Sequence, residues 1–267
     1  MIKVLVSGAA GRMGREVVKA VAGDAETQLV GAVDKHAVGR DAGEVAGIDR
    51  QNVLIADDLA QALRASGAEV AVDFSTPYAV LGNIRTMLDA GVSPVVGTTG
   101  IKQNDLDEID RASRAAGVPV FIAPNFAIGA VLMMRFAAEC SKLFDAAEII
   151  EYHHDQKLDA PSGTAFKTAQ MMRAARDEDF KRVGGDEESE GSVAPHSRGG
   201  QIGGVAIHSV RLAGYLAHQE VIFGMAGQTL SIRHDTITRE CYMPGVLRAI
   251  KAVRGLQGLT YGLENIL

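Results

Sequence analysis

The sequence predicts an α/β protein in which a Rossmann-type dinucleotide-binding domain is joined to an α+β domain with an open mixed sheet. Two observations carry this prediction. Between residues 2 and 122, short apolar strands alternate with helical segments, which is typical of a parallel sheet with right-handed crossovers. After residue 126, a long apolar helix and several β-rich runs replace that alternation. We therefore expect the first domain over 1–127 and 236–267, and the second over 128–235.

The first strand, at residues 2–7, is rich in Val, Leu and Ile, as expected of a strand buried on both faces. The turn that follows reads Gly8-Ala9-Ala10-Gly11-Arg12-Met13-Gly14, and a helical pattern and a second strand at 27–33 come next. Asp34 ends that strand, 34 − 14 = 20 positions after the last glycine. An acid at about this distance binds the ribose in the dinucleotide-binding fingerprint, of which G-x-x-G-x-x-G is a variant. A tight turn without a ligand is the simpler alternative.

The strand and helix alternation continues with less glycine. We expect strands at 53–55, 70–74, 94–96 and 118–122, and helices at 57–66, 78–90 and 103–116. The segments that follow the last three strands are Phe74-Ser75-Thr76, Gly97-Thr98-Thr99 and Ala123-Pro124-Asn125-Phe126. Ligands of such sheets bind at the carboxyl ends of the strands. Each segment alone fits a plain turn, but together they indicate a cofactor site.

The second domain begins with an apolar helix at 128–144 and a strand at 146–153. A helix at 162–175 and a polar segment at 176–201 follow, and we expect the polar segment to be a solvated, mobile loop. Three β-rich runs then complete an antiparallel or mixed sheet, at 204–212, 220–225 and 229–234. A last helix at 242–254 and the tail at 261–267 should pack back on the first domain.

The stretch 151–164 carries the most distinctive chemistry of the chain. It places His153, His154 and Lys157 between the end of a strand and the turn Ser162-Gly163-Thr164, which begins a helix. An imidazole and an ammonium can protonate or polarise a substrate, and the N–H groups of a helix N-terminus bind a carboxylate or phosphate. The simpler alternative is a strand end followed by an ordinary serine cap.

Composition excludes several classes of function. The net charge of −6 in 267 residues leaves no basic field for nucleic acid or an anionic membrane, so an anionic ligand must be held by local groups. No apolar run approaches the roughly 20 residues that span a bilayer. The two cysteines form no pairing motif, which favours a reduced, cytoplasmic setting. We expect no metal site, since neither H-E-x-x-H nor a Cys/His cluster occurs, and no acyl-transfer hydrolase, since no Gly-x-Ser-x-Gly occurs.

Over essentially its whole length, the chain resembles the 4-hydroxy-tetrahydrodipicolinate reductases, also called dihydrodipicolinate reductases, of lysine and diaminopimelate biosynthesis. The segments that carry the resemblance are 8–14, 97–99, 123–126 and, above all, 151–164, which reads EYHHDQKLDAPSGT. The resemblance implies an NAD(P)H-binding domain, a substrate domain whose sheets join a homotetramer, and a small dicarboxylate substrate. It also implies NADH or NADPH as the cofactor.

The resemblance further implies roles for individual residues. His153 is similar to the family's proton donor and Lys157 to its partner, while His154, Ser162, Gly163 and Thr164 resemble the pocket for the substrate carboxylate. The cofactor residues that the resemblance and the fingerprint together imply are Gly8, Ala9, Ala10, Gly11, Arg12, Met13, Asp34, Lys35, Gly97, Thr98, Thr99, Ala123, Pro124, Asn125 and Phe126.

Two alternatives remain open at this point. One is another two-domain NAD(P)-dependent reductase or dehydrogenase of an amino-acid-derived acid, such as an aspartate dehydrogenase. The other is a non-catalytic dinucleotide sensor, for which the pair His153 and Lys157 would have no use. As for the cofactor, Asp34 favours NADH because a carboxylate repels a 2′-phosphate, and Lys35 offsets that repulsion. We expect both coenzymes to be used, with NADH equal or somewhat preferred.

Overall fold

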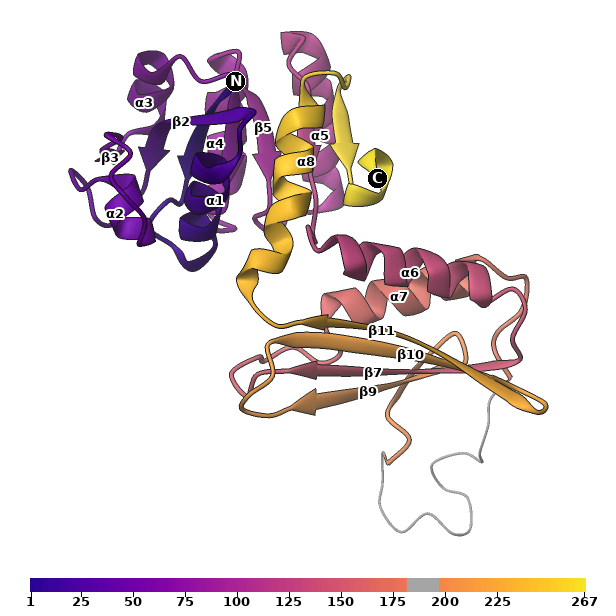
Figure 1. Ribbon diagram of the computed structural model, residues 1–267. Coiled ribbons are helices and arrows are strands. Elements are labelled where there is room, and N and C mark those ends of the chain that lie inside the picture. The colour runs from indigo at the N-terminus through magenta and orange to yellow at the C-terminus, as the bar shows by residue number, and fades with distance from the viewer. Residues whose placement is uncertain (182–196) are drawn as a thin grey trace. The chain divides into compact units, whose positions relative to one another are not determined.

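The computed structural model describes residues 1–181 and 197–267, which form two compact units. The first unit comprises Met1–Ile128 and Arg239–Leu267, and the second comprises Gly129–Thr238. Each unit is built on a sheet of its own, as Figure 1 shows. The prediction of a mobile loop over 176–201 falls mainly on residues 182–196, which lie outside the described residues.

The described residues of the first unit form a seven-stranded parallel sheet with the order β12-β6-β5-β4-β1-β2-β3. Its strands are β1 (Ile2–Ser7), β2 (Thr27–Val33), β3 (Ile55–Ala56), β4 (Val70–Asp73), β5 (Ser93–Val96), β6 (Val120–Ile122) and β12 (Leu259–Tyr261). The strand order reverses at β1, which pairs with β2 on one side and β4 on the other. Open α/β sheets bind ligands at this point of reversal, beyond the carboxyl ends of the strands.

Helices cover both faces of this sheet. They are α1 (Arg12–Gly23), α2 (Ala42–Ala46), α3 (Leu59–Ser66), α4 (Val80–Asp89), α5 (Gln103–Ala116) and α8 (Met243–Val253), with the 3₁₀ turns η1 (Arg239–Tyr242) and η2 (Leu263–Ile266). α1 contacts α8 on one face, while α4 contacts α3 and α5 on the other (Figure 1). Val4, Leu5 and Val6 of the central strand are completely buried, as a strand covered on both faces should be.

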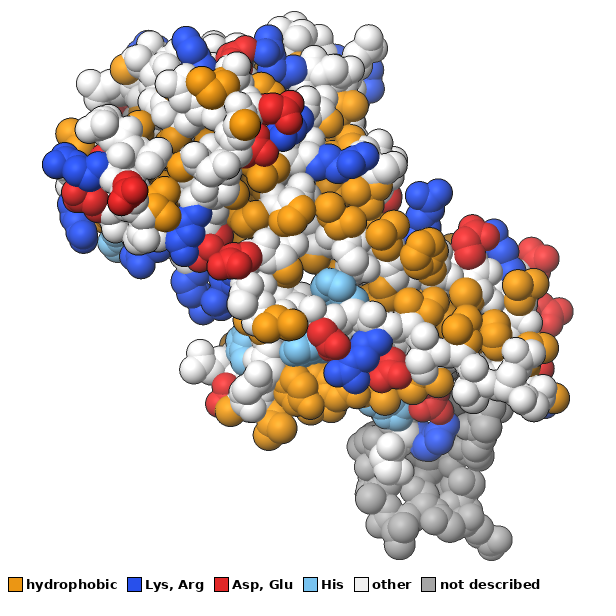
Figure 2. Space-filling model, viewed as in Figure 1, with side chains coloured by type: hydrophobic (Ala, Val, Ile, Leu, Met, Phe, Trp, Pro, Cys, Tyr) orange, Lys and Arg blue, Asp and Glu red, His pale blue; other side chains and the backbone are white. Residues whose placement is uncertain are grey.

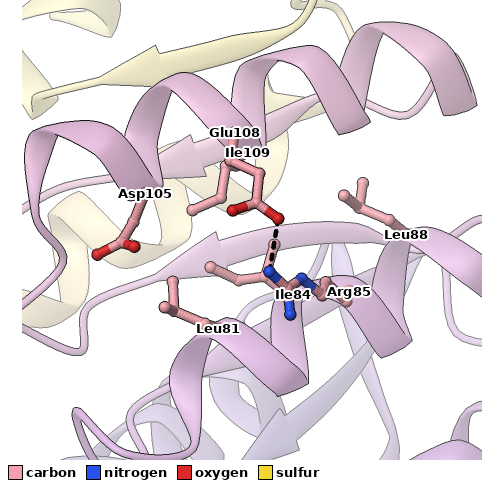
Figure 3. A pocket seen from close by; sticks show the side chains of 7 residues that line it. All are labelled: Leu81, Ile84, Arg85, Leu88, Asp105, Glu108 and Ile109. Carbon is pink, nitrogen blue, oxygen red and sulfur yellow. Dashed lines mark hydrogen bonds and ion pairs between the residues drawn. The ribbon is translucent and has the colours of Figure 1, made fainter.

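A shallow groove runs between α4 and α5 (Figure 3). The ion pair between Arg85 and Glu108 spans it, with 2.5 Å between Nη2 and Oε1. Its other lining residues are Leu81, Ile84, Leu88, Asp105 and Ile109. The groove lies at the contact between two packed helices. None of the residues expected to bind ligand lies in it.

The described residues of the second unit form a five-stranded mixed sheet with the order β11-β10-β7-β9-β8. Its elements are α6 (Ile128–Cys140), β7 (Ala146–His153), α7 (Gly163–Ala174), β8 (Gly200–Ile202), β9 (Val205–Arg211), β10 (Ala217–Met225) and β11 (Gln228–Thr236). β7 and β9 run parallel, and the other neighbouring strands are antiparallel. The predicted fold class is therefore confirmed, with a Rossmann-type parallel sheet and a second, mixed sheet.

α6 and α7 lie on one face of the second sheet (Figure 1). Alternate residues of β7 face these helices, so that Ala147, Ile149 and Glu151 are buried, while Ile150 and Tyr152 on the other face are half-buried. The strand pattern of the sequence identified β7 with its observed bounds. It did not reveal that Glu151, an acid, occupies a position that the alternation reserves for the core.

Several element ends differ by one to three residues from the sequence-based expectation, and the larger differences concern short elements and one helix end. α2, β8 and β12 were not expected, because elements of three to five residues are too short to show a period. α6 ends at Cys140 and does not run to residue 144. There the hydroxyl of Ser141 donates to the carbonyl oxygens of Ala138 and Met172, which fixes the turn that follows the helix. β12 pairs with β6, which adds the C-terminal segment to the first sheet.

Candidate active site

The glycine turn between β1 and α1 is shaped by close backbone approaches. Gly8 has a φ of +80°, and a Cβ there would lie 2.5 Å from the carbonyl oxygen of Phe74. A Cβ on Gly14 would lie 1.9 Å from the carbonyl oxygen of Gly8. Gly11 is the N-cap of α1, and since glycine has no side chain, the first turn of this helix keeps outward N–H groups for an anion. These residues fit a dinucleotide pyrophosphate.

Asp34 stands directly after β2 and connects the glycine turn with the loop that follows β2. Its Oδ2 accepts from the backbone N–H of Ala10 at 2.9 Å, and its Oδ1 accepts from the N–H of His36 at 2.8 Å. Each carboxylate oxygen keeps a lone pair for a ribose hydroxyl. The ammonium of Lys35 donates to the carbonyl oxygen of Asp57 at 2.8 Å, so it is anchored rather than free in solvent.

Asp73, the last residue of β4, is completely buried and ties two of the predicted cofactor segments together. Its Oδ1 accepts from the hydroxyls of Ser75 and Thr98, both at 2.7 Å, and from the N–H of Ser75 at 3.1 Å. Its Oδ2 accepts from the side-chain amide of Asn83 on α4, also at 2.7 Å. The hydroxyl of Thr98 is therefore engaged inside the protein and orders the turn after β5.

The remaining predicted cofactor residues lie beyond β5 and β6. A Cβ on Gly97 would lie 2.1 Å from the ring of Phe74, so a larger residue there would force that ring to move. Phe126 is buried against Phe74 and Phe121, with ring centroids 5.9 and 6.0 Å away. Its ring is thus part of the core, and only its backbone is available to a ligand. Ala123 is buried, Pro124 is exposed, and Asn125 accepts from the N–H of Ala127.

In the second unit, the end of β7 places His153 beside a buried carboxylate. Glu151 and His153 share one face of the strand, and Nδ1 of His153 is hydrogen-bonded to Oε2 of Glu151. Arg211, the last residue of β9, binds the same carboxylate through both terminal nitrogens, at 2.9 and 2.8 Å. Burial alone would raise the pKa of Glu151, but the hydrogen bonds from His153, Arg211 and Ser209 outweigh it and hold that pKa at about 2.

The turn that begins α7 is joined to the same carboxylate. Ser162 is the N-cap of the helix, and its hydroxyl accepts from the N–H of Ala165 at 3.2 Å. The N–H of Ser162 donates to Oε1 of Glu151 at 3.1 Å. Gly163 and Thr164 form the first turn, where helix geometry directs the N–H groups outward and the helix dipole favours an anion.

Between β7 and α7, a loop carries the two remaining predicted residues. The ammonium of Lys157 binds both carboxylate oxygens of Asp159, at 2.7 and 2.8 Å. Nη2 of Arg211 donates to the carbonyl oxygen of Asp159 at 2.6 Å, which fixes the loop. His154 is half-buried, and its carbonyl oxygen accepts from the N–H of Lys157 at 3.2 Å. The structure therefore brings His153, Lys157 and Ser162 into one hydrogen-bonded cluster, held by Glu151 and Arg211.

Sequence reasoning missed the four polar residues that hold these sites in place. The sequence does mark Glu151 and Asp73, because each is an acid among the apolar residues of a buried strand, where a charged side chain needs a partner. It does not mark Asn83 and Arg211, since they meet their partners only through the tertiary fold, 10 and 60 positions away along the chain.

The described residues carry charged side chains of both signs. On the face drawn in Figure 2, basic and acidic side chains of the described residues are interspersed. Within residues 1–181 and 197–267, no group of three His, Cys, Asp or Glu side chains is placed to hold a metal ion. The same residues include no helix that is long and apolar enough to cross a membrane.

Comparison with known proteins places the chain in one family. The family model described as "Dihydrodipicolinate reductase, N-terminus" matches residues 2–126, and "Dihydrodipicolinate reductase, C-terminus" matches residues 129–267. The 4-hydroxy-tetrahydrodipicolinate reductase of Moorella thermoacetica is 50% identical over 266 residues, which cover 100% of this chain and 98% of the relative. That of Desulfitobacterium hafniense strain DCB-2 is 49% identical over 267 residues, with the same coverage.

Solved structures agree with this assignment. Dipicolinate-bound dihydrodipicolinate reductase from Paenisporosarcina sp. TG-14 is 40% identical, with a TM-score of 0.87 and complete coverage of both chains. An amine dehydrogenase from Mycobacterium smegmatis has a TM-score of 0.67 at 16% identity, covering 97% of this chain and 94% of that chain, and shows a shared fold alone. The chain therefore belongs to the dihydrodipicolinate reductase family, a family of nicotinamide-dinucleotide-dependent oxidoreductases.

Proposed function

We propose that this protein reduces 4-hydroxy-tetrahydrodipicolinate to tetrahydrodipicolinate, with His153 as the proton donor and Lys157 as its partner. The reaction is the reduction step of the diaminopimelate route to lysine, which the names of its relatives support. The observation that carries the residue roles is that the segment 151–164 joins an imidazole, an ammonium and a helix N-terminus in one cluster. Reduction of a ring carbon leaves negative charge on the substrate, and a positioned acid neutralises it.

The substrate is a small dicarboxylate, and we assign its recognition to the second unit, which we propose as the substrate and tetramerisation domain (128–235). One carboxylate binds the first turn of α7 at Gly163 and Thr164, together with His154 and the hydroxyl of Ser162, whose own N–H donates to Glu151. The name of the dipicolinate-bound relative, which holds a planar dicarboxylate, supports this assignment. Lys157 must give up its ion pair with Asp159 in order to bind the substrate. The loss is small, because an ion pair near the surface contributes little stability.

We assign cofactor binding to the first unit, the NAD(P)-binding domain (1–127 and 236–267). The reduced nicotinamide dinucleotide supplies the hydride when it is bound. Residues 8–13 hold its pyrophosphate at the start of α1, and Asp34 accepts from the adenosine ribose. Gly97–Thr99 and Ala123–Phe126 orient the nicotinamide, mainly through their backbone, since the side chains of Thr98 and Phe126 are engaged in the core.

For the choice of cofactor we propose use of both NADH and NADPH, with NADH equal or somewhat preferred. Two backbone N–H groups already stabilise the charge of Asp34, which weakens its repulsion of a 2′-phosphate. Lys35 can reach that phosphate only by leaving the carbonyl of Asp57. Michaelis constants for both coenzymes decide this. If Lys35→Ala leaves the NADPH constant unchanged, Lys35 has no part in the site, and a strong wild-type preference for NADPH would contradict our assignment of Asp34.

We further propose a homotetramer joined through the second sheet, in the cytoplasm. On the face opposite α6 and α7, Ile150 and Tyr152 of β7 and Ile222 of β10 are half-buried apolar side chains, and in the register Ile150 lies opposite Glu220 and Ile222 opposite Glu148. Analytical ultracentrifugation should find a tetramer that Ile222→Glu dissociates. Leu143→Glu, at an exposed position after α6, should not. A wild type that sediments as a monomer would refute the assembly.

The reductase activity is tested by following the oxidation of NADH in the presence of the condensation product of pyruvate and aspartate semialdehyde. We expect oxidation that depends on this product and that dipicolinate inhibits. Oxidation with oxaloacetate and ammonia in its place would indicate an aspartate dehydrogenase. Tight NADH binding without turnover of either substrate would indicate a dinucleotide sensor.

A further inference from the structure

We infer that Glu151 is the positioning residue of this site, which fixes the ring orientation and tautomer of His153 and couples that ring to the carboxylate-binding turn at Ser162. The inference rests on the proposed role of His153 as the proton donor. It adds a residue that does not touch the substrate but determines which nitrogen of the imidazole faces it.

The contacts of Glu151 are arranged as such a role requires. Its side chain is completely buried. Each of its two oxygens accepts one hydrogen bond from Arg211 and one from a residue of the proposed site. Oε2 binds Nδ1 of His153 and one terminal nitrogen of Arg211, while Oε1 binds the N–H of Ser162 and the other terminal nitrogen. The bidentate ion pair with Arg211 holds the carboxylate in a single orientation. The fixed carboxylate in turn orients the side chain of His153 and the backbone of Ser162.

The charge of Glu151 determines the tautomer of His153. A carboxylate accepts hydrogen bonds and donates none, so the nitrogen that faces it must carry a proton. With a proton on Nδ1, Nε2 is the nitrogen left to exchange a proton with the substrate. The pKa of Glu151, held at about 2, keeps the group ionised at neutral pH.

A purely structural role explains this arrangement less well. A buried ion pair gains little net stability over apolar side chains of similar volume, because both charges lose their hydration. Apolar neighbours on the same face, Ala147 and Ile149, show that this part of β7 packs without charge. Arg211 also holds the loop of Lys157 through the carbonyl of Asp159. The pair thus connects the proton donor, the anion-binding turn and the loop of Lys157.

Glu151→Gln tests the inference because it keeps the shape and removes the charge. Its carbonyl oxygen can still accept from Ser162, but its NH₂ then faces Nδ1 and favours the opposite tautomer, with the proton on Nε2. We expect kcat to fall about 10–100-fold, by analogy with the loss of partners that orient metal-ligating histidines. The pH dependence of kcat should shift, while the affinity for NADH stays unchanged.

The matched control is Gln219→Met. Gln219 pairs with Glu151 in the sheet register, is equally enclosed, and donates to Thr168 on α7, but it makes no contact with His153. This variant should lose stability and keep the pH profile of the wild type. If Glu151→Gln fails to fold, Glu151→Asp decides, because it keeps the charge beside Arg211 and shortens its reach to His153. We expect Glu151→Asp to have a lower kcat than the wild type and a higher stability than Glu151→Gln.

Nitrogen NMR of ¹⁵N-histidine-labelled full-length protein separates this inference from the proposed function. The signals of His153 are assigned by their loss in His153→Gln. We expect a proton on Nδ1 in the wild type, a proton mainly on Nε2 in Glu151→Gln, and a mixture of the two tautomers in Glu151→Asp. An unchanged tautomer together with an unchanged pH profile would overturn the inference. If the tautomer changes but His153→Gln keeps full activity, the coupling stands and the assignment of the proton donor fails.

Discussion

The buried carboxylate of Asp73 offers a quantitative test of how the cofactor segments are held. In Asp73→Asn, one oxygen can still accept from Ser75 and Thr98, but the new NH₂ then faces the amide NH₂ of Asn83, which now donates to Oδ2 at 2.7 Å. Two donors then oppose each other in the core. Leaving a buried donor unpaired and losing a hydrogen bond to a charged group costs about 1.5–3 kcal/mol.

We therefore expect the free energy of unfolding in urea to fall by about 2 kcal/mol, and the Kd of NADH, measured by fluorescence, to rise severalfold. The affinity should fall because Asp73 orders the turns after β4 and β5 together. Asp73→Asn/Asn83→Asp restores an amide opposite a carboxylate and should recover at least half of both losses. Asp89→Asn, exposed at the end of α4, is the control. A single variant that binds NADH as the wild type does would refute the reasoning.

Three further predictions concern stability and local geometry. Gly8→Ala should abolish measurable NADH binding, because its Cβ meets the carbonyl of Phe74 at 2.5 Å and the φ of +80° disfavours alanine; wild-type affinity by calorimetry would contradict the turn geometry. Ser162→Ala should lower the free energy of unfolding by about 1 kcal/mol through loss of the cap and raise the KM of the substrate, whereas an unchanged KM would remove the turn from the site. The pKa of Glu151, lowered from 4.5 to about 2, contributes about 3 kcal/mol that is present above pH 4.5 and lost as the pH falls towards 2. The stability difference between the wild type and Glu151→Gln should therefore shrink over that range, and a difference independent of pH would show that Glu151 is not ionised.

The order of elements in the first unit was accessible from the sequence because β1, β2, β3 and β5 are each followed directly by glycine or aspartate. β2 and α5 have the bounds that the pattern predicted, and the glycine turn lies where the fingerprint requires it. α2 and β12 were not accessible, since a helix of five residues and a strand of three depend on their tertiary partners. The prediction failed for these elements because they are short, and not because their composition was ambiguous.

The site was accessible where the chain is contiguous and inaccessible where the fold brings distant segments together. His153, Lys157 and Ser162 lie within ten positions of one another, so one stretch revealed them. Arg211 joins them only because β9 pairs with β7 in parallel, with Arg211 opposite His153 in the register. The pairing of a buried acid with this arginine follows from sheet topology, and no local motif encodes it.

The most direct test of the account is the kcat of His153→Gln, measured by NADH oxidation at saturating substrate, together with its Kd for NADH. Glutamine keeps a polar side chain at the end of β7 but cannot donate a proton as an acid. The account predicts that kcat falls about 10²–10⁴-fold, the range that a general acid contributes, while the Kd for NADH stays at the wild-type value. A variant with wild-type kcat would contradict the assignment of His153 as the proton donor.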